Sequence, residues 1–494
     1  MSLTAPAPGI EGLGKRRWAA LTILLLALAM SLFDVTIVNL TLPSVTKSFG
    51  EHPIILSWLV AGYLLGYALS LVPAGRAGDR FGHKWIFIIG VAGYVLTAIM
   101  VSVSADANIL IVGRVLHGIA GGLMVAPITA FIHLMFPGVS KVRAFGYFAA
   151  TTGLAALVGP IIGGVVLDAI GVQDGWRWAL IVGLPLGVIA FILAFALLPN
   201  IRGSVSGSFD VLGMLLLSIV VVGFIAPLMQ QLPDWTWISL GIAVVVLIIF
   251  ILWERAVDHR GATPVLRLSH FRKLPFSLGL LQVVLGFASF TSPIYIAIIT
   301  VWQWGRGEDA LQTALVMLTF GLGAIIGGVI DARFTLWFRR WDATAALILL
   351  VLGYVVTYLL LVADGAHVSL LVLAIPLLFA GIGNGAFIGM IMSTILSAVP
   401  ARDAGSAGGL VVTAMRLGSA FGAAVILILT ALPAAKGASE SQHWIDNGNW
   451  GVLGCIVFAA VALLLAIIVG VRTPKDTSAS AGEDALVPDE VITK

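Results

Sequence analysis

Long apolar runs separated by short polar stretches follow one another along the chain. A window of about 19 to 20 residues, the length of helix that crosses ~30 Å of hydrocarbon, detects these runs. There are fourteen, centred near residues 30, 64, 94, 122, 156, 187, 219, 245, 289, 321, 352, 381, 418 and 461. Helices satisfy their own backbone groups in lipid, so the pattern predicts an all-α integral membrane protein with fourteen transmembrane helices.

The polar interruptions group the runs as six, two and six. The expected units are a cytoplasmic N-terminal tail (1–16), a six-helix bundle (17–200), two inserted linker helices (201–268), a second six-helix bundle (269–472) and a disordered cytoplasmic tail (473–494). A partial repeat indicates duplication of the six-helix unit. Gly75 to Arg80 and Gly327 to Arg333 each follow the second run of a half, and each has glycine four residues before aspartate.

Positive charge is distributed unequally between the two sides of the membrane. If the N-terminus is cytoplasmic, the opposite side receives only Lys47, Arg177, Arg306 and Lys436. Because cytoplasmic loops carry the excess of lysine and arginine, both termini are predicted to be cytoplasmic in a multi-pass protein of the cell membrane. The same rule accounts for the net charge of +3, so no nucleic-acid partner is expected.

The composition restricts the chemistry. Hydrophobic residues make up 60% of the 494 residues and charged ones 10%, with a mean hydropathy of +1.08. Cys455 is the only cysteine, which excludes an intrachain disulfide and a thiolate metal cluster. The sequence has no G-x-x-x-x-G-K-[ST] phosphate loop, H-E-x-x-H zinc pair or G-x-S-x-G nucleophile elbow. We expect no enzyme activity, no metal and no cofactor.

A glycine-rich stretch with charges of both signs, from Gly75 to Lys84, separates the second and third runs. Its glycines permit close turns and its basic residues place it at the cytoplasmic surface, which predicts a tight hairpin. The expected gating residues are Gly75, Asp79, Arg80, Gly82 and Lys84. In this interpretation Asp79 latches the inner gate against the N-terminus of a helix beginning near Asp403, where the helix dipole favours an anion.

Asp34 is the one acidic residue that the pattern places deep within a span. A carboxylate in hydrocarbon costs at least ~2.5 kcal/mol, so it needs a partner, a water-filled cavity or a proton. Each suits a proton-coupled transporter in which Asp34 is the coupling carboxylate. The alternative is a carboxylate that only packs helices together, hydrogen-bonded to a neighbouring hydroxyl such as that of Thr36.

Two arginines, Arg114 and Arg416, lie within spans and also require partners. At ~1.5 Å per residue, Asp34 lies roughly 24 Å from the inner end of the first helix and Arg114 roughly 9 Å from the outer end of the fourth. Both fall in the outer half of the membrane, so the two can interact. His117 either joins a proton relay, since histidine titrates near physiological pH, or stays neutral and hydrogen-bonded to the backbone.

The fifth run contains a cluster of glycines with one proline. Its candidate residues are Gly153, Gly159, Pro160, Gly163 and Gly164. Glycine lets a neighbouring helix approach closely, and Pro160 removes a backbone hydrogen bond and permits a bend. An ordinary helix-packing face is the alternative to a functional motif.

Four of these segments resemble motifs of the major facilitator superfamily. The pattern G-x-x-x-D-R-x-G-H-K resembles its loop between helices 2 and 3. Phe33 to Pro43 resembles the first-helix signature of the fourteen-span drug:proton antiporters, whose aspartate is implicated in coupling or cation binding. Gly113 to Gly122 resembles the fourth-helix motif whose arginine is linked to proton transfer, with His117 in place of the usual glutamine. The G-P-x-x-G-G core resembles the motif of exporters.

The resemblance covers about residues 17–472 and implies a major facilitator fold that works by alternating access. The implied activity is multidrug efflux, the proton-coupled export of lipophilic or cationic drugs by a monomer. There are departures: Gly183 stands where asparagine is common, and Met415 occupies the usual arginine position, with Arg416 one place along. A dedicated exporter of a metabolite, lipid or amino acid is the alternative within this class. A non-transporting membrane enzyme or sensor is the alternative outside it.

Candidates for a substrate cavity combine polar and aromatic side chains. They are Asn39, Gln282, Tyr295, Asn384 and Arg416. Broad drug binding uses apolar and aromatic walls with few polar anchors. The same residues also fit ordinary membrane packing.

Overall fold

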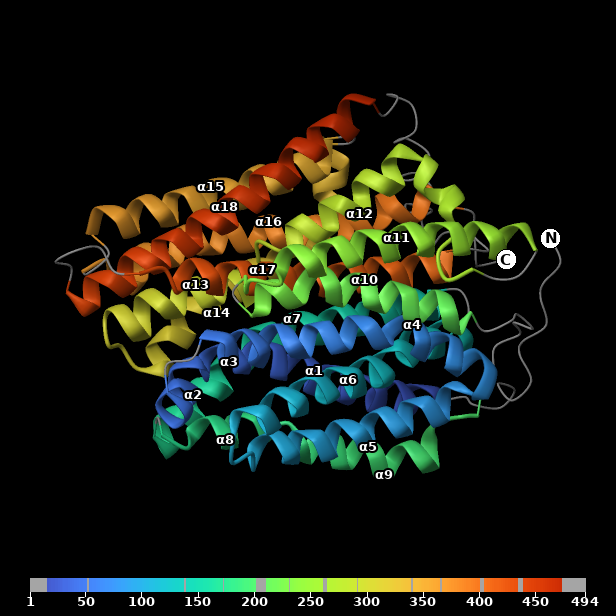
Figure 1. Ribbon diagram of the computed structural model, residues 1–494, viewed down its shortest axis with the longest axis horizontal. Helices are drawn as coiled ribbons and strands as arrows, with labels where there is room; N and C mark the ends of the chain where they lie inside the picture. The colour runs from blue at the N-terminus through green and yellow to red at the C-terminus, as the bar shows by residue number, and fades with distance from the viewer. Residues whose placement is uncertain are drawn as a thin grey trace, which may run out of the picture.

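The structure is a computed structural model. It describes residues 16–50, 53–136, 139–171, 173–200, 210–230, 232–260, 264–290, 292–338, 341–364, 367–399, 404–433 and 439–472. In these ranges the regular structure is helical, and fourteen segments are long and apolar enough to cross a membrane (Figure 1). The predicted all-α class and number of spans are confirmed. The predicted disordered tail, 473–494, lies outside the described residues.

Six spans form the N-terminal half. Its elements are α1 (Arg16–Leu40), α2 (Leu42–Phe49), α3 (Pro53–Ser57), the π-helical turn η1 (Trp58–Gly62), α4 (Tyr63–Phe81), α5 (His83–Ser102), α6 (Ala107–Met135), α7 (Val139–Ile170), α8 (Gly175–Ile181) and α9 (Leu184–Leu197). The second span is the succession α3, η1 and α4, and the sixth is interrupted between α8 and α9.

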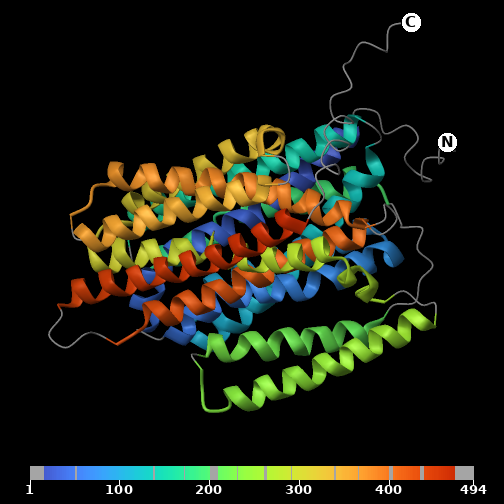
Figure 2. The ribbon, with the colours of Figure 1, turned by 90° about the horizontal axis from the view of Figure 1, so that it is seen from above.

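The inserted pair and the C-terminal half follow. Their elements are α10 (Val211–Met229), α11 (Thr236–His259), the 3-10 turn η2 (Leu268–Arg272), α12 (Leu274–Phe287), α13 (Ser292–Ile299), the π-helical turn η3 (Thr300–Gly305), α14 (Ala310–Phe338), α15 (Asp342–Asp364), α16 (Leu370–Ser397), α17 (Ala404–Thr430) and α18 (Glu440–Arg472). The pair α10 and α11 lies along one side of the bundle (Figure 2).

The helices run roughly parallel to the long axis (Figure 1). Because the number of spans is even, the start of α1 at Arg16 and the end of α18 at Arg472 lie at the same end of the bundle. We call this the terminal end and the opposite one the distal end.

Glycine brings the second and fourth spans of each half into backbone contact. A Cβ on Gly66 of α4 would collide with the carbonyl of Val115 in α6, and one on Gly118 with the carbonyl of Tyr63. In the C-terminal half, Gly323 of α14 meets the carbonyl of Leu378 in α16 in the same way. Close approach through glycine is a common way for membrane helices to associate. The repeated crossing supports the duplication, and it brings α6 with Arg114 against α4 and η1.

Candidate functional site

An ion pair between Asp34 of α1 and Arg114 of α6 is buried inside the N-terminal half. Arg114 donates from Nη1 to both carboxylate oxygens of Asp34, at 2.9 and 3.0 Å. Arg114 is fully buried and Asp34 is 7% exposed. From their depth along the helices, Asp34 and Arg114 were expected in the same half of the membrane. The structure brings the two side chains into direct contact.

Arg114 has two further partners on the second span. Its Nε donates to the carbonyl of Leu59 at 2.7 Å, and its Cζ lies 4.7 Å from the centroid of the Tyr63 ring. Leu59 belongs to the π-helical turn η1. Backbone hydrogen bonds in a π-turn run from residue i to i+5 instead of i+4, and this change of register leaves the Leu59 carbonyl available to the Arg114 side chain. Such turns are frequent at functional sites. Arg114 therefore keeps a carbonyl and a ring as partners if Asp34 becomes neutral.

His117 adjoins the ion pair. Its Nδ1 is hydrogen-bonded to the Thr97 hydroxyl at 2.8 Å, and its Nε2 lies 3.6 Å from Asp34 Oδ1. The Tyr94 ring packs on the imidazole, with centroids 3.8 Å apart. His117 is thus held by the Thr97 side chain and by a backbone interaction with Tyr94, and its Nε2 faces the carboxylate.

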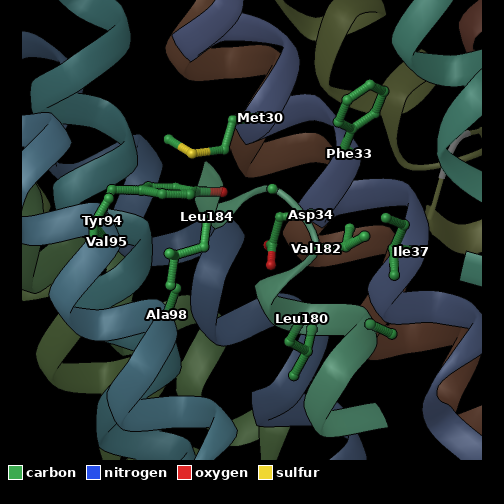
Figure 3. A pocket seen from close by; sticks show the side chains of 12 residues that line it. Met30, Phe33, Asp34, Ile37, Tyr94, Val95, Ala98, Leu180, Val182 and Leu184 are labelled. Atoms are coloured by element: carbon green, nitrogen blue, oxygen red, sulfur yellow. The ribbon is translucent and has the colours of Figure 1, made fainter. Parts of the chain in front are cut away.

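A small pocket of about 10 Å³ lies beside Asp34 (Figure 3). Its walls come from α1, α5 and the break between α8 and α9, and include Met30, Tyr94 and Leu184. Gly183 lines the break, and a Cβ there would come within 2.9 Å of the Met30 side chain. Glycine at position 183, where asparagine is common, therefore leaves this space open. The volume of the pocket is about the minimum that holds one water.

Aromatic side chains connect the ion pair to the C-terminal half. The Tyr63 hydroxyl is hydrogen-bonded to Ser31 Oγ at 2.9 Å, and the rings of Tyr63 and Tyr67 lie 5.9 Å apart. Arg416 of α17 places its Cζ 4.5 Å from the centroid of the Tyr67 ring of α4. Sequence reasoning missed Tyr63 and Tyr67, although two tyrosines one turn apart in an apolar span were the available signal.

The gating stretch is mostly helical, and the turn is confined to Gly82. Gly82 has φ of 102°, a value that favours glycine, and it separates α4 from α5. Asp79 Oδ1 lies 3.2 Å from Nε2 of the buried His83, and Lys84 Nζ donates to the Phe195 carbonyl at 2.7 Å. Arg80 lies over the Phe81 ring.

The structure gives no packing reason for Gly75 and does not describe the expected partner of Asp79. A Cβ on Gly75 would meet no atom within 4 Å, so packing does not require glycine there in this arrangement. Asp403, the expected latch partner of Asp79, lies outside the described residues. Sequence reasoning did not single out His83, whose ring also abuts Gly78.

The glycine motif of α7 packs on two different helices. A Cβ on Gly159 would collide with Thr36 Oγ1 of α1, and one on Gly163 would lie 3.2 Å from the Ile37 side chain. Gly153 and Gly164 instead face α14, where Cβ atoms would come within 2.9 Å of Ile325 and 3.1 Å of Leu311. Pro160 lies inside the helix between these contacts. The motif therefore joins the helix that carries Asp34 to the other half.

The candidates for a substrate cavity are not gathered into one cluster by the described contacts. Asn39 donates to Ser292 Oγ of α13 at 3.3 Å, and so connects the two halves. Gln282 and Asn384 are buried, and Tyr295 packs edge-on against Phe320 at 6.2 Å. Arg416 is the candidate that contacts Tyr67, which packs on Tyr63 beside the ion pair.

Sequence reasoning also missed two buried acids at the terminal ends of the inserted helices. Asp210 is 7% exposed and Glu254 is fully buried. Hydropathy placed both at the polar margins of their spans, where acids are usually solvated.

Fourteen apolar helices, with a buried and hydrogen-bonded ion pair in the N-terminal half, define a polytopic membrane protein. The family model described as Major Facilitator Superfamily matches residues 24–208 and 202–423. The chain belongs to the Major Facilitator Superfamily, and it is a transporter rather than an enzyme.

Three curated relatives match most of the chain. The protein named Probable actinorhodin transporter, of Streptomyces coelicolor, is 32% identical over 83% of this chain and 72% of its own length. The Tetracenomycin C resistance and export protein of Streptomyces glaucescens is 28% identical over 86% of this chain and 78% of its own length. The Putative multidrug resistance protein MdtD of Salmonella typhi is 27% identical over 93% and 96%.

Solved structures share the fold. A bacterial homologue of the human lysosomal transporter Spinster, inward-facing and occupied, has a TM-score of 0.64 at 14% identity and covers 92% of this chain and 98% of its own. A D-xylose-proton symporter has a TM-score of 0.62 at 15% identity and covers 89% and 97%. The predicted major facilitator fold is confirmed.

Proposed function

We propose that the protein exports lipophilic or cationic small molecules across the cell membrane in exchange for protons. The observation that carries the proposal is the buried pair of Asp34 and Arg114, with His117 and a water-sized pocket beside it. A membrane carboxylate that is paired with an arginine, with space for one water beside it, has the components of a proton site.

In the proposed cycle a proton from outside neutralises Asp34. Asp34 lies toward the distal end of α1, which is the outer side if both termini are cytoplasmic. Arg114 then loses its anion but keeps Leu59 and Tyr63 as partners, so neutralising Asp34 weakens the connection between α1 and α6. That change biases the two halves toward the other access state.

The halves are in contact near the distal end, which supports an inward-facing arrangement. Asn39 donates to Ser292 there, and Gly164 abuts Leu311. In this state the substrate cavity would face the cytoplasm.

The direction of transport rests on the glycine motif of α7 and on the names of the relatives, which include export and multidrug resistance. The two Streptomyces relatives are named for one compound each, actinorhodin and tetracenomycin C. Those names favour the second candidate, a dedicated exporter of one metabolite. The proton gradient would drive either kind of export without a cofactor, and a monomer would suffice.

The test uses inverted membrane vesicles that contain the full chain and have an acidified interior. Addition of ethidium should release protons from vesicles with the wild-type protein, as reported by an acridine dye, while ethidium accumulates inside. Asp34→Asn should abolish both signals, whereas Glu440→Gln, which changes an exposed acid at the start of α18, should leave both unchanged.

Substrate-dependent proton release in the Asp34→Asn variant would contradict the coupling role. Proton release together with loss of ethidium from preloaded vesicles would show an importer. A panel of structurally different dyes and antibiotics separates the two candidates. Several active compounds indicate a multidrug pump, and one indicates a dedicated exporter.

A further inference from the structure

Two acids of the inserted pair are buried side by side at the terminal end. Asp210 caps the start of α10, and Glu254 lies in the last turns of α11. Among the described residues, Asp210 Oδ2 and Glu254 Oε1 have no hydrogen-bond partner, although both are buried. An unpaired buried polar atom is costly, so these two oxygens require an explanation.

The second oxygen of each carboxyl group accepts hydrogen bonds from neighbouring residues. Asp210 Oδ1 accepts from the backbone N–H of Gly213 at 2.9 Å and from Trp253 Nε1 at 2.8 Å. Glu254 Oε2 accepts from the backbone N–H of Leu266 at 3.0 Å. The anchored oxygens fix the orientation of the two carboxyl groups, which leaves one unpaired oxygen on each.

The two unpaired oxygens converge on one point. A Cβ on Gly213 would collide with both Asp210 Oδ2 and Glu254 Oε1, so the oxygens flank the space that this glycine leaves empty. The two carboxyl groups also interact electrostatically. Two buried carboxylates in such proximity repel each other, and a proton held between them removes the repulsion and supplies the missing hydrogen bond.

Arg76, a basic residue of the gating stretch, is close enough for its charge to act on both acids. It interacts electrostatically with Glu254 and Asp210, and also with Asp79 and Arg267. Its Nη2 nevertheless donates to the carbonyl of Pro264, at 2.7 Å, rather than to either unpaired oxygen. The guanidinium thus interacts with the acids through its charge, while its hydrogen bond goes to Pro264.

We infer that Asp210 and Glu254 form a second proton-binding site, which holds one shared proton and links the inserted helices to the gating stretch through Arg76. When the proton is present, the acids hydrogen-bond to each other and Arg76 stays on Pro264. When it leaves, the two anionic oxygens attract Arg76, which moves the end of α4.

The position of α10 gives this site access to both halves. α10 packs against α4 of the N-terminal half and against α17 of the C-terminal half, along the side of the bundle shown in Figure 2. A proton at its terminal end therefore acts where the two halves move relative to each other. The site stands apart from Asp34, and the inference does not depend on the direction of transport.

Infrared difference spectroscopy between acidic and alkaline pH tests the site on the purified full-length protein in nanodiscs. The carbonyl stretch of a protonated carboxyl group should be present at neutral pH and should lose one carboxyl's intensity in Glu254→Gln and in Asp210→Asn. Both variants keep the anchored oxygen as an acceptor. Asp258→Asn, which alters an exposed acid on the same helix, should keep the band, as should Asp34→Asn.

The link to the gating stretch has its own readouts. Arg76→Gln removes the cation beside the acids, so the band should persist about one pH unit higher, a tenfold gain in proton affinity. Gly75→Cys in a Cys455→Ser background provides a labelling site in open space. Its labelling rate, measured relative to that of a free thiol because thiol ionisation alone makes labelling depend on pH, should change with pH, and Glu254→Gln should remove that remaining dependence.

A band that Glu254→Gln and Asp210→Asn both leave intact would overturn the proton site. Labelling at position 75 that depends equally on pH with and without Glu254 would overturn the link to the gating stretch. Because neither measurement involves transport, failure here is distinguishable from failure of the proposed export activity.

Discussion

Replacing Arg114 with methionine should destabilise the protein by about 3–5 kcal/mol, the usual cost of removing one partner from a buried ion pair. Methionine retains most of the length of the side chain, so the main loss is electrostatic. Asp34 would remain 7% exposed without the donor that now contacts both its oxygens. The Leu59 carbonyl would also lose its bond from Arg114.

A double-mutant cycle separates the ion pair from these side effects. Asp34→Asn leaves a buried guanidinium with Leu59 and Tyr63 as partners, so its cost should fall toward the lower end of the same range. The double variant Asp34→Asn with Arg114→Met removes both charges and should be more stable than the sum of the two single effects implies. A coupling energy of about 2 kcal/mol or more is expected for groups in direct contact.

Chemical unfolding in mixed micelles, followed by far-UV circular dichroism, measures the four proteins. Arg306 and Glu308 supply the control cycle, since their atoms lie 3.4 Å apart with side chains that are 15% and 28% exposed. A pair near the surface should couple by no more than about 1 kcal/mol. If the Asp34 and Arg114 cycle couples no more strongly than this control, the pair is not the electrostatic centre of the N-terminal half.

Three further outcomes follow from single positions. His117→Asn removes the ring beside the ion pair but not the pair itself, so export should continue with an altered pH profile, and complete loss of export would contradict this. Gly159→Ala should cost about 1–3 kcal/mol in thermal unfolding by overpacking against Thr36, and Thr36→Ala should restore most of that loss. Gly82→Ala should cost about 1–3 kcal/mol because its φ of 102° with ψ of 129° is strained for any residue with a Cβ, whereas Gly75→Ala, in open space within a helix, should be neutral or stabilising.

The number of spans could be predicted because membrane insertion depends mainly on apolar length. The pairing of Asp34 with Arg114 was accessible for a similar reason, since helical rise alone fixes depth along each span. The partners of Arg114 on the second span were not accessible. Leu59 becomes an acceptor within a π-helical turn, and nothing in the apolar pattern from Trp58 to Gly62 distinguishes a π-turn from an α-turn.

The gating stretch shows where local patterns fall short. Its glycines favoured a hairpin over ten residues, yet the helix continues through Phe81 because only Gly82 takes a positive φ. Asp210 and Glu254 show the limit of hydropathy. Both lie at polar margins, and their burial arises from tertiary packing, in part from Leu266, which folds back over Glu254.

The α7 helix explains how a charge change at Asp34 can reach the other half without passing through the substrate. Gly159 and Gly163 hold α7 against the turn of α1 that follows Asp34, and Gly153 and Gly164 hold it against α14. Glycine contacts leave little space for independent adjustment, because protein interiors are close-packed. In the proposed cycle, a shift of α1 when Asp34 takes a proton would therefore move α7 with it, and the contact between α7 and α14 would transmit that shift to the other half.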